Sequence, residues 1–159
     1  MEKKRSRGVT IFAWLLIGLN VITLLQSYNF KIYFDLYKSF DRSAVVAIIL
    51  YTVLSAVIGI AAGFGILKLK EIMRKAAVLI NALDVLFNVP LFFISADEIR
   101  RYSYSVAVAM AEKTPTSLNI DMLTNVGFYS AAFTNFFYTV LSLLLIFFLT
   151  RTKVKEQFQ

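Results

Sequence analysis

The sequence predicts an all-α, polytopic membrane protein built as an up-down bundle of four transmembrane helices. Four long apolar runs, residues 9–26, 44–67, 76–94 and 126–150, take up more than half of the 159 residues and hold a single charge, Asp84. A bilayer core is about 30 Å thick and takes about 20 helical residues to cross, so each run can span once. Hydrophobic residues make up 58% of the chain, more than a soluble domain of this size could bury. We expect one transmembrane domain over residues 1–159.

The first run, residues 9–26, follows a basic start, as a secretory signal peptide would. It is longer than a typical signal-peptide core, and the stretch from Leu25 to Tyr28 offers no small-residue cleavage site. We therefore expect an uncleaved membrane anchor.

Aromatic residues recur at helical spacing in the link that follows: Phe30, Tyr33, Phe34, Tyr37 and Phe40. Charged residues gather on a narrow opposite strip: Lys31, Asp35, Lys38 and Arg42. This pattern predicts a short helix lying in the membrane interface. The aromatic residues either anchor the link, as aromatic belts commonly do, or form a surface for a partner.

The second run, residues 44–67, carries small residues at four-residue intervals: Ser55, Gly59 and Gly63. Ala47 and Tyr51 continue the same line. Small residues so spaced let another helix approach closely. We expect a close helix contact here, either inside one bundle or with a second copy of the chain.

In the third run, residues 76–94, Asn81, Asp84 and Asn88 fall at three- and four-residue steps and so face one direction. Insertion scales assign an Asp at a helix centre about 2.5 to 3.5 kcal/mol, and no other run holds a Lys or Arg to neutralise it. Asp84 must therefore be protonated, multiply hydrogen-bonded, hydrated or paired with a cation. Pro90 lacks an N–H, which predicts a helix kink and a free carbonyl at Leu86.

Counting about 1.5 Å per residue from the cytoplasmic ends of the runs places Asp84 level with Gly59, within a layer of polar side chains. The candidate intramembrane polar or ion site comprises Asp84, Asn81, Asn88, Asn20, Ser55, Thr139 and Ser142. Such an oxygen-rich set suits H⁺ or Na⁺ better than a soft metal. Two other interpretations stay open: the groups satisfy one another as interhelical hydrogen bonds, or they line a pocket for a polar ligand.

The second outer link opens with Ser95, Ala96, Asp97 and Glu98, which have the spacing of a helix capping box. Apolar residues then fall on one helical face: Ile99, Tyr102, Val106, Ala109 and Met110. Pro115 is expected to stop this helix. The link is predicted to be a second surface helix or an extension of the third span.

Basic residues concentrate in three short segments: before the first run, between the second and third, and after the fourth. These segments hold eleven of the seventeen Lys and Arg residues. The positive-inside bias then places both termini in the cytoplasm. Membrane orientation explains the net charge of +7 better than nucleic acid does, so we expect no nucleic-acid partner.

The chain has neither cysteine nor histidine. Disulfides, thiolate nucleophiles, Ser-His hydrolysis, His-ligated haem and the usual zinc sites are therefore excluded. We expect no enzyme activity, no cofactor and no bound metal.

Two short motifs carry a resemblance: Arg7-Gly8-Val9-Thr10-Ile11, and the segment from Gly65 to Glu71 with Arg74-Lys75-Ala76 after it. They resemble small prokaryotic four-span membrane proteins of unassigned function. The resemblance implies a plasma membrane and no particular activity. Small multidrug exporters have a similar size, but their acid lies in the first span, where this chain has Asn20. The missing cysteines disfavour tetraspanin-like and claudin-like proteins.

These observations favour a structural, accessory or interaction role in the membrane, through association with a second copy or with another membrane protein. The alternative is an ion- or proton-coupled transporter or channel that uses Asp84.

Overall fold

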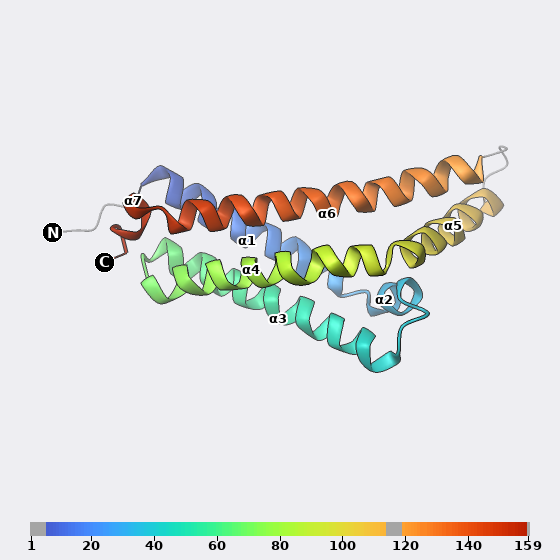
Figure 1. Cartoon of the computed structure of the whole chain (residues 1–159), viewed down its shortest axis with the longest axis horizontal. Helices are drawn as coiled ribbons and strands as arrows, with labels where there is room; N and C mark the ends of the chain where they lie inside the picture. The colour runs from blue at the N-terminus through green and yellow to red at the C-terminus, as the bar shows by residue number, and fades with distance from the viewer. Residues whose placement is uncertain (1–5, 114–118, 159) are drawn as a thin grey trace.

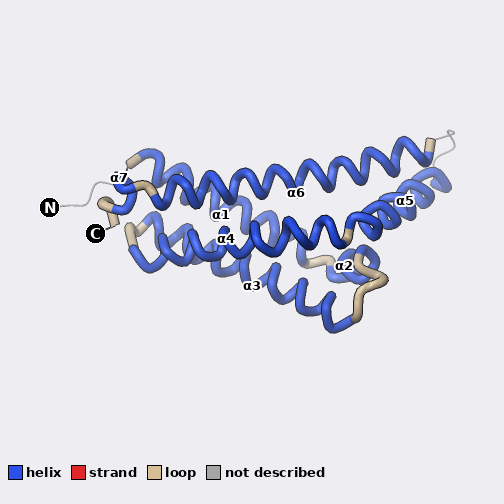
Figure 2. The backbone as a smooth tube through the Cα atoms, in the orientation of Figure 1, coloured by secondary structure: helices blue, strands red, loops and turns tan. Residues whose placement is uncertain are grey.

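In the computed structural model, residues 6–113 and 119–158 are described, and every regular element within them is a helix (Figures 1 and 2). Four helices are long and apolar enough to cross a bilayer: α1 (Arg7–Ser27), α3 (Arg42–Leu67), α4 (Glu71–Ile94) and α6 (Ile120–Thr150). The predicted all-α bundle of four helices able to span a membrane is confirmed.

Three of the four long helices, α1, α3 and α6, begin before their apolar runs, because a polar side chain caps the first turn of each. The Ser6 hydroxyl accepts from the Val9 N–H (3.4 Å) at α1. Asp41 accepts from the Ser43 N–H (3.2 Å) at α3, and Asn119 accepts from the Met122 N–H (3.0 Å) at α6. These bonds satisfy N–H groups that have no partner within the helix, so the helices extend into the polar flanks.

The bundle is built by neighbours in sequence: α1 packs on α3, α3 on α4, and α4 on α6. α1 also meets α6 near the described termini, where the rings of Phe12 and Phe148 stack with centroids 4.1 Å apart. We call this end of the bundle the terminal end and the opposite end the far end (Figure 1). The terminal end contains the main apolar core.

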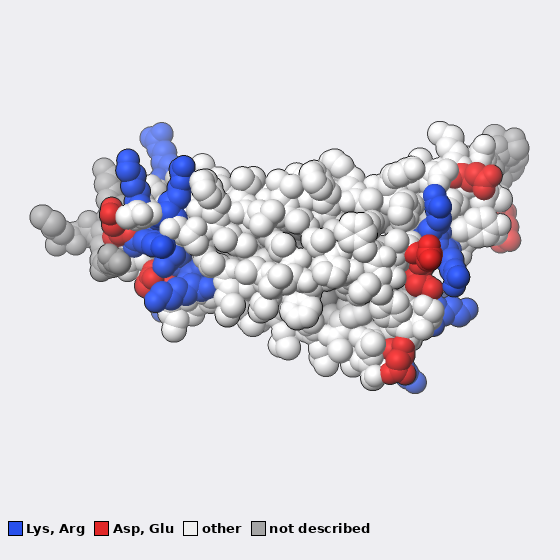
Figure 3. Space-filling model, in the orientation of Figure 1, with Lys and Arg blue, Asp and Glu red and all other residues white. Residues whose placement is uncertain are grey.

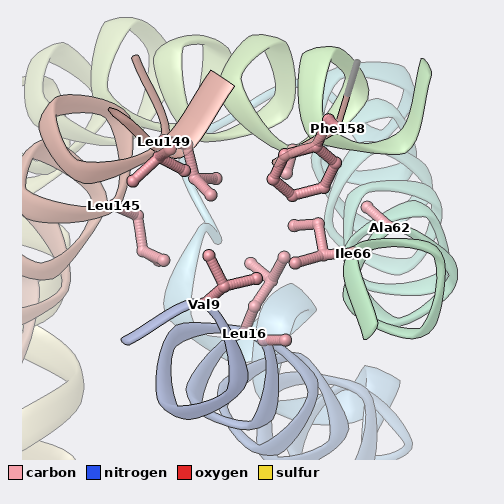
Figure 4. Packing of buried hydrophobic residues seen from close by; sticks show 10 residues of the cluster. Val9, Leu16, Ala62, Ile66, Leu145, Leu149 and Phe158 are labelled. Carbon is pink, nitrogen blue, oxygen red and sulfur yellow. The ribbon is translucent and has the colours of Figure 1, made fainter. Parts of the chain in front are cut away.

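The C-terminal segment closes this core. After α6, the short helix α7 (Thr152–Lys155) turns back, and Val154 and Phe158 are buried among residues of the other helices, including Val9, Ile66 and Leu149 (Figure 4). The side-chain carbonyl of Gln157 accepts from the Ser6 N–H (2.9 Å), so the two ends of the described chain touch.

The second outer link forms α5 (Ala96–Lys113), which continues beyond α4 and packs along α6 (Figure 1). The contact is close, because a Cβ at Gly127 would lie 3.0 Å from the Cβ and hydroxyl of Ser103. Of the two predicted alternatives, the extension of the third span is the one observed. The Ser95 hydroxyl donates back to the Leu91 carbonyl (2.6 Å), so it serves the end of α4 and not the start of α5. Pro115 lies outside the described residues.

The first outer link forms the short helix α2 (Phe30–Leu36), which packs against α3 and α5. Tyr37, just after it, is buried with Val45 and Ile49, and burial raises the pKa of its phenol although a hydrogen bond with Ser95 opposes the shift. Part of the aromatic face therefore fills the far end of the bundle, while Phe30 stays exposed to the surroundings.

Candidate functional site

Asp84 lies in the middle of α4, thirteen residues after Glu71. The Tyr51 hydroxyl of α3 donates to its Oδ1 (2.7 Å), and the Tyr51 ring lies 5.3 Å from that of Phe87. Within the described residues, no Lys or Arg forms an ion pair with Asp84. The partner of the intramembrane acid is thus a neutral phenol.

A phenol donor suits either protonation state of this carboxyl group. Oδ1 accepts the Tyr51 proton whether the carboxyl is ionised or carries a proton on its other oxygen. The hydrogen bond supplies part of the polar stabilisation that an acid needs in an apolar environment. The pair can therefore fix two helices, and it can also gain or lose a proton without losing their contact.

The two amides nearest the middle of the bundle are turned onto their own helices. Asn81 is buried and donates to the carbonyl of Ala77 (2.8 Å). Asn20 donates to the carbonyl of Leu16 (2.7 Å). These bonds satisfy the amides locally and do not link them to Asp84.

The remaining predicted polar residues lie on the α4 and α6 side. The Asn88 side chain is exposed, and its backbone carbonyl accepts from the side chain of Asn135 (3.4 Å). The Thr139 hydroxyl donates to the Asn135 carbonyl (2.9 Å), and Ser142 is half-buried further along α6. The described hydrogen bonds therefore do not gather the seven predicted groups into one shell.

The small residues of α3 face α1. A Cβ at Gly59 would lie 2.5 Å from the amide atoms of Asn20, and one at Gly63 would lie 2.5 Å from Cγ1 of Ile17. Ser55 is also buried, and its hydroxyl donates to a carbonyl of its own helix. Of the two predicted uses of this face, packing inside one bundle is the one observed.

Tyr51 belongs to the same four-residue line but faces α4, because each four-residue step advances about 40° around a helix. From Tyr51 to Gly63 the drift is about 120°, enough to change the neighbouring helix. From sequence, Asp84 was placed level with Gly59 because residues were counted from the first apolar residue of the third run. α4 begins earlier, at Glu71, and Met73 packs against Gly65, which brings Asp84 toward Tyr51.

From sequence, Arg74 was interpreted as one of the charges that set orientation and as part of a resemblance motif, yet it is buried. Its Nε and Nη2 donate to the two carboxylate oxygens of Glu71 (2.7 and 2.6 Å), and its Nη1 donates to the carbonyl of Leu149 (2.7 Å). The guanidinium carbon also lies 6.0 Å from the ring centroid of Phe158. Arg74 therefore joins α4 to the end of α6 and to the C-terminal segment. The three-residue spacing from Glu71 was the available sequence signal.

Among residues 6–113 and 119–158, no group of three or more Asp or Glu side chains is placed to hold a metal ion. In comparisons with known proteins, no family model, no curated protein and no solved structure matches the chain. The four apolar helices identify a multi-pass membrane protein.

Proposed function

We propose that this multi-pass membrane protein has a structural or accessory role, acting through association with a second copy or with another membrane protein, and that it catalyses no reaction. The supporting observation is that its interior polar groups are engaged within the chain. Asp84 is bonded to Tyr51, and Asn81 and Asn20 are bonded to their own helices. Groups bonded in this way fix the positions of the helices.

The apolar surface supports contact with lipid and with other membrane helices. On α6, aromatic side chains are largely exposed, with Phe133 at 68% and Phe136 at 66%. Figure 3 shows an uncharged middle zone between two charged ends. The bilayer is the main partner of this zone, and a partner helix would replace lipid there.

We place the protein in the plasma membrane with both termini in the cytoplasm. The contact between Ser6 and Gln157 and the even number of long helices agree with termini on one side. The basic residues around the terminal end support the cytoplasmic side by the positive-inside rule (Figure 3). The resemblance to small prokaryotic four-span proteins supports the plasma membrane.

The second candidate is transport of H⁺ or Na⁺, favoured by the Tyr51–Asp84 pair. An acid in the middle of a span, held by a donor that tolerates both protonation states, is the kind of group that proton relays use.

A flux assay in proteoliposomes separates the two candidates. Wild-type protein, Asp84→Asn and Tyr51→Phe are reconstituted, and H⁺, Na⁺ and K⁺ fluxes are followed against empty liposomes. Under our proposal all three proteins give the flux of empty liposomes. A wild-type flux that Asp84→Asn abolishes, with helix content and thermal unfolding unchanged, would replace the accessory role by transport.

Association is tested separately. The chain is expressed with an affinity tag, crosslinked in intact membranes and purified, and its mass is measured by light scattering in detergent. Our proposal expects a discrete assembly larger than one chain. A monomer without crosslinked products at native expression would contradict it.

A further inference from the structure

At the far end, α5 and the first turns of α6 line an open cleft of about 830 Å³. Its walls carry charges of both signs, with Asp97, Arg100 and Arg101 on α5 and Asp121 on α6. Figure 3 shows positive and negative side chains side by side at this end. The cleft lies outside the polar interior described above.

Its position corresponds to the headgroup layer of a bilayer. Arg100 follows the last residue of α4, Ile94, by six residues, which is about 9 Å along a helix. On α6, about 20 residues counted back from Thr150 cross the hydrocarbon core, and Asn125 lies about 8 Å beyond that point. Headgroups occupy about 5 to 7 Å on each side of the core, so Arg100 and Asn125 lie at the outer edge of the headgroup layer.

Arg100 is held in place by uncharged neighbours. Its guanidinium carbon lies 5.3 Å from the ring centroid of Phe128, and its Nη2 donates to Oδ1 of Asn125 (3.4 Å). Neither neighbour neutralises the charge. The guanidinium is therefore oriented and keeps donors free for an anion.

The carboxylates of the cleft are also free of salt bridges. In the described part of the chain, Asp97 and Asp121 form no ion pair within 4.0 Å, and neither does Arg100; Arg101 is paired with Glu98 (3.3 Å). Opposite charges thus share one cleft without cancelling each other. A ligand with both a phosphate and an ammonium group would match them together.

We propose that this cleft binds the headgroup of an amine-bearing zwitterionic phospholipid. The phosphate lies at Arg100, whose planar donors suit phosphate oxygens. The primary ammonium lies at Asp121, one helical turn before Asn125 on α6, and donates to its carboxylate. The acyl chains then continue along the apolar surface below the cleft.

The test uses native mass spectrometry of the full chain in detergent, with phosphatidylethanolamine, phosphatidylcholine and phosphatidylglycerol of identical acyl chains. Phosphatidylethanolamine is expected to bind about tenfold more tightly than phosphatidylcholine, whose ammonium has no N–H donor. Arg100→Gln should weaken binding of all three lipids about tenfold. Asp121→Asn should remove the preference for phosphatidylethanolamine and leave phosphatidylglycerol binding at least as tight.

Arg42→Gln is the matched control, because Arg42 is an exposed arginine at the far end outside the cleft. Equal binding of the three lipids by wild type, or the same loss in Arg42→Gln as in Arg100→Gln, would overturn the proposal. The wild-type lipid comparison tests it even if a variant fails to fold. Soluble O-phosphoethanolamine is added as a competitor of bound phosphatidylethanolamine. If it displaces the bound lipid as effectively as free phosphatidylethanolamine does, the cleft is a site for a soluble zwitterion and the proposal is wrong.

Discussion

The hydrogen bond from Tyr51 to Asp84 connects α3 to α4 at the depth where an unpaired charge is most costly. Hydrogen bonds between membrane helices contribute on average about 0.6 kcal/mol. The bond therefore does less to stabilise the bundle than to fix the register of α3 against α4.

Asp84→Asn keeps an acceptor for Tyr51 and removes the need to accommodate a charge. We expect the free energy of unfolding to stay within about 0.5 kcal/mol of wild type or to rise. Asp84→Leu removes the acceptor and should cost about 1 to 2 kcal/mol, because the Tyr51 hydroxyl loses its partner. Unfolding in detergent measures both.

Adding Tyr51→Phe to Asp84→Leu should recover most of that loss, since the orphaned hydroxyl is then gone. If Asp84→Asn were as destabilising as Asp84→Leu, the charge itself would be required, and a bound cation would be the explanation.

Arg74 joins more parts of the molecule than any predicted site residue. Arg74→Lys cannot keep the paired bonds to Glu71 together with the bond to the Leu149 carbonyl, because one ammonium lacks the planar fork of a guanidinium. We expect a loss of about 1 to 3 kcal/mol in unfolding free energy.

Lys75→Met is the control for Arg74→Lys. Lys75 lies one residue on, is 70% exposed and reaches Glu71 only at 3.7 Å, so its loss should change stability by less than about 0.5 kcal/mol. If both substitutions changed the free energy of unfolding equally, the buried contacts of Arg74 would not contribute to stability.

At the scale of elements, the contact of α1 with α3 depends on the absence of side chains at Gly59 and Gly63. Gly59→Leu places atoms where the Asn20 amide lies, so α1 must move. We expect a loss of about 2 kcal/mol or more, as for overpacked cores, measured by thermal unfolding in detergent. Ile58→Leu, at an exposed neighbouring position, is the control and should be near neutral. Equal melting temperatures would place this face against lipid.

The start of α3 depends on Asp41. The Ser43 hydroxyl and N–H both donate to its carboxylate and hold its pKa below the usual range. A lowered pKa in the folded state means that the cap contributes above the unfolded value, near 3.9, and is lost as pH falls through the folded value. The stability difference between wild type and Asp41→Ala should therefore be constant from about pH 7 to 5 and shrink at lower pH. Asp35→Ala, in the same link, controls for the loss of one carboxylate.

The four membrane-spanning helices were predictable from sequence, because the thickness of the bilayer sets the length of an apolar run and the apolar environment requires a helix. The need of Asp84 for a partner was predictable as well. The identity of Tyr51 was not, because a tyrosine in an apolar run is also an ordinary interfacial or packing residue. Arg74 was missed because its contacts with Leu149 and Phe158 join segments far apart in the chain. The course of α5 was left open, since its apolar face fits lipid and α6 equally well.

Across the whole molecule, the two ends of the bundle differ. The terminal end is sealed by a single apolar cluster that includes Val154 and Phe158 from the C-terminal segment (Figure 4). The far end extends further, because α6, at 31 residues or about 46 Å, exceeds the thickness of a bilayer core and is accompanied by α5. The terminal end thus contains the main apolar core, while α5 and the start of α6 add surface at the far end.

Orientation in the membrane follows from the same asymmetry and can be tested in intact cells. The chain has no cysteine, so single cysteines give unambiguous labelling. Ser6→Cys and Thr152→Cys report the terminal end, and Ser39→Cys and Ser105→Cys report the far end; all four positions are exposed and none of the changes alters charge. A membrane-impermeant maleimide added outside should label the far-end pair alone, and all four after permeabilisation. Labelling of the terminal-end pair alone would reverse the orientation. Labelling of Ser6→Cys without Thr152→Cys would mean an odd number of crossings, which the bond between Ser6 and Gln157 contradicts.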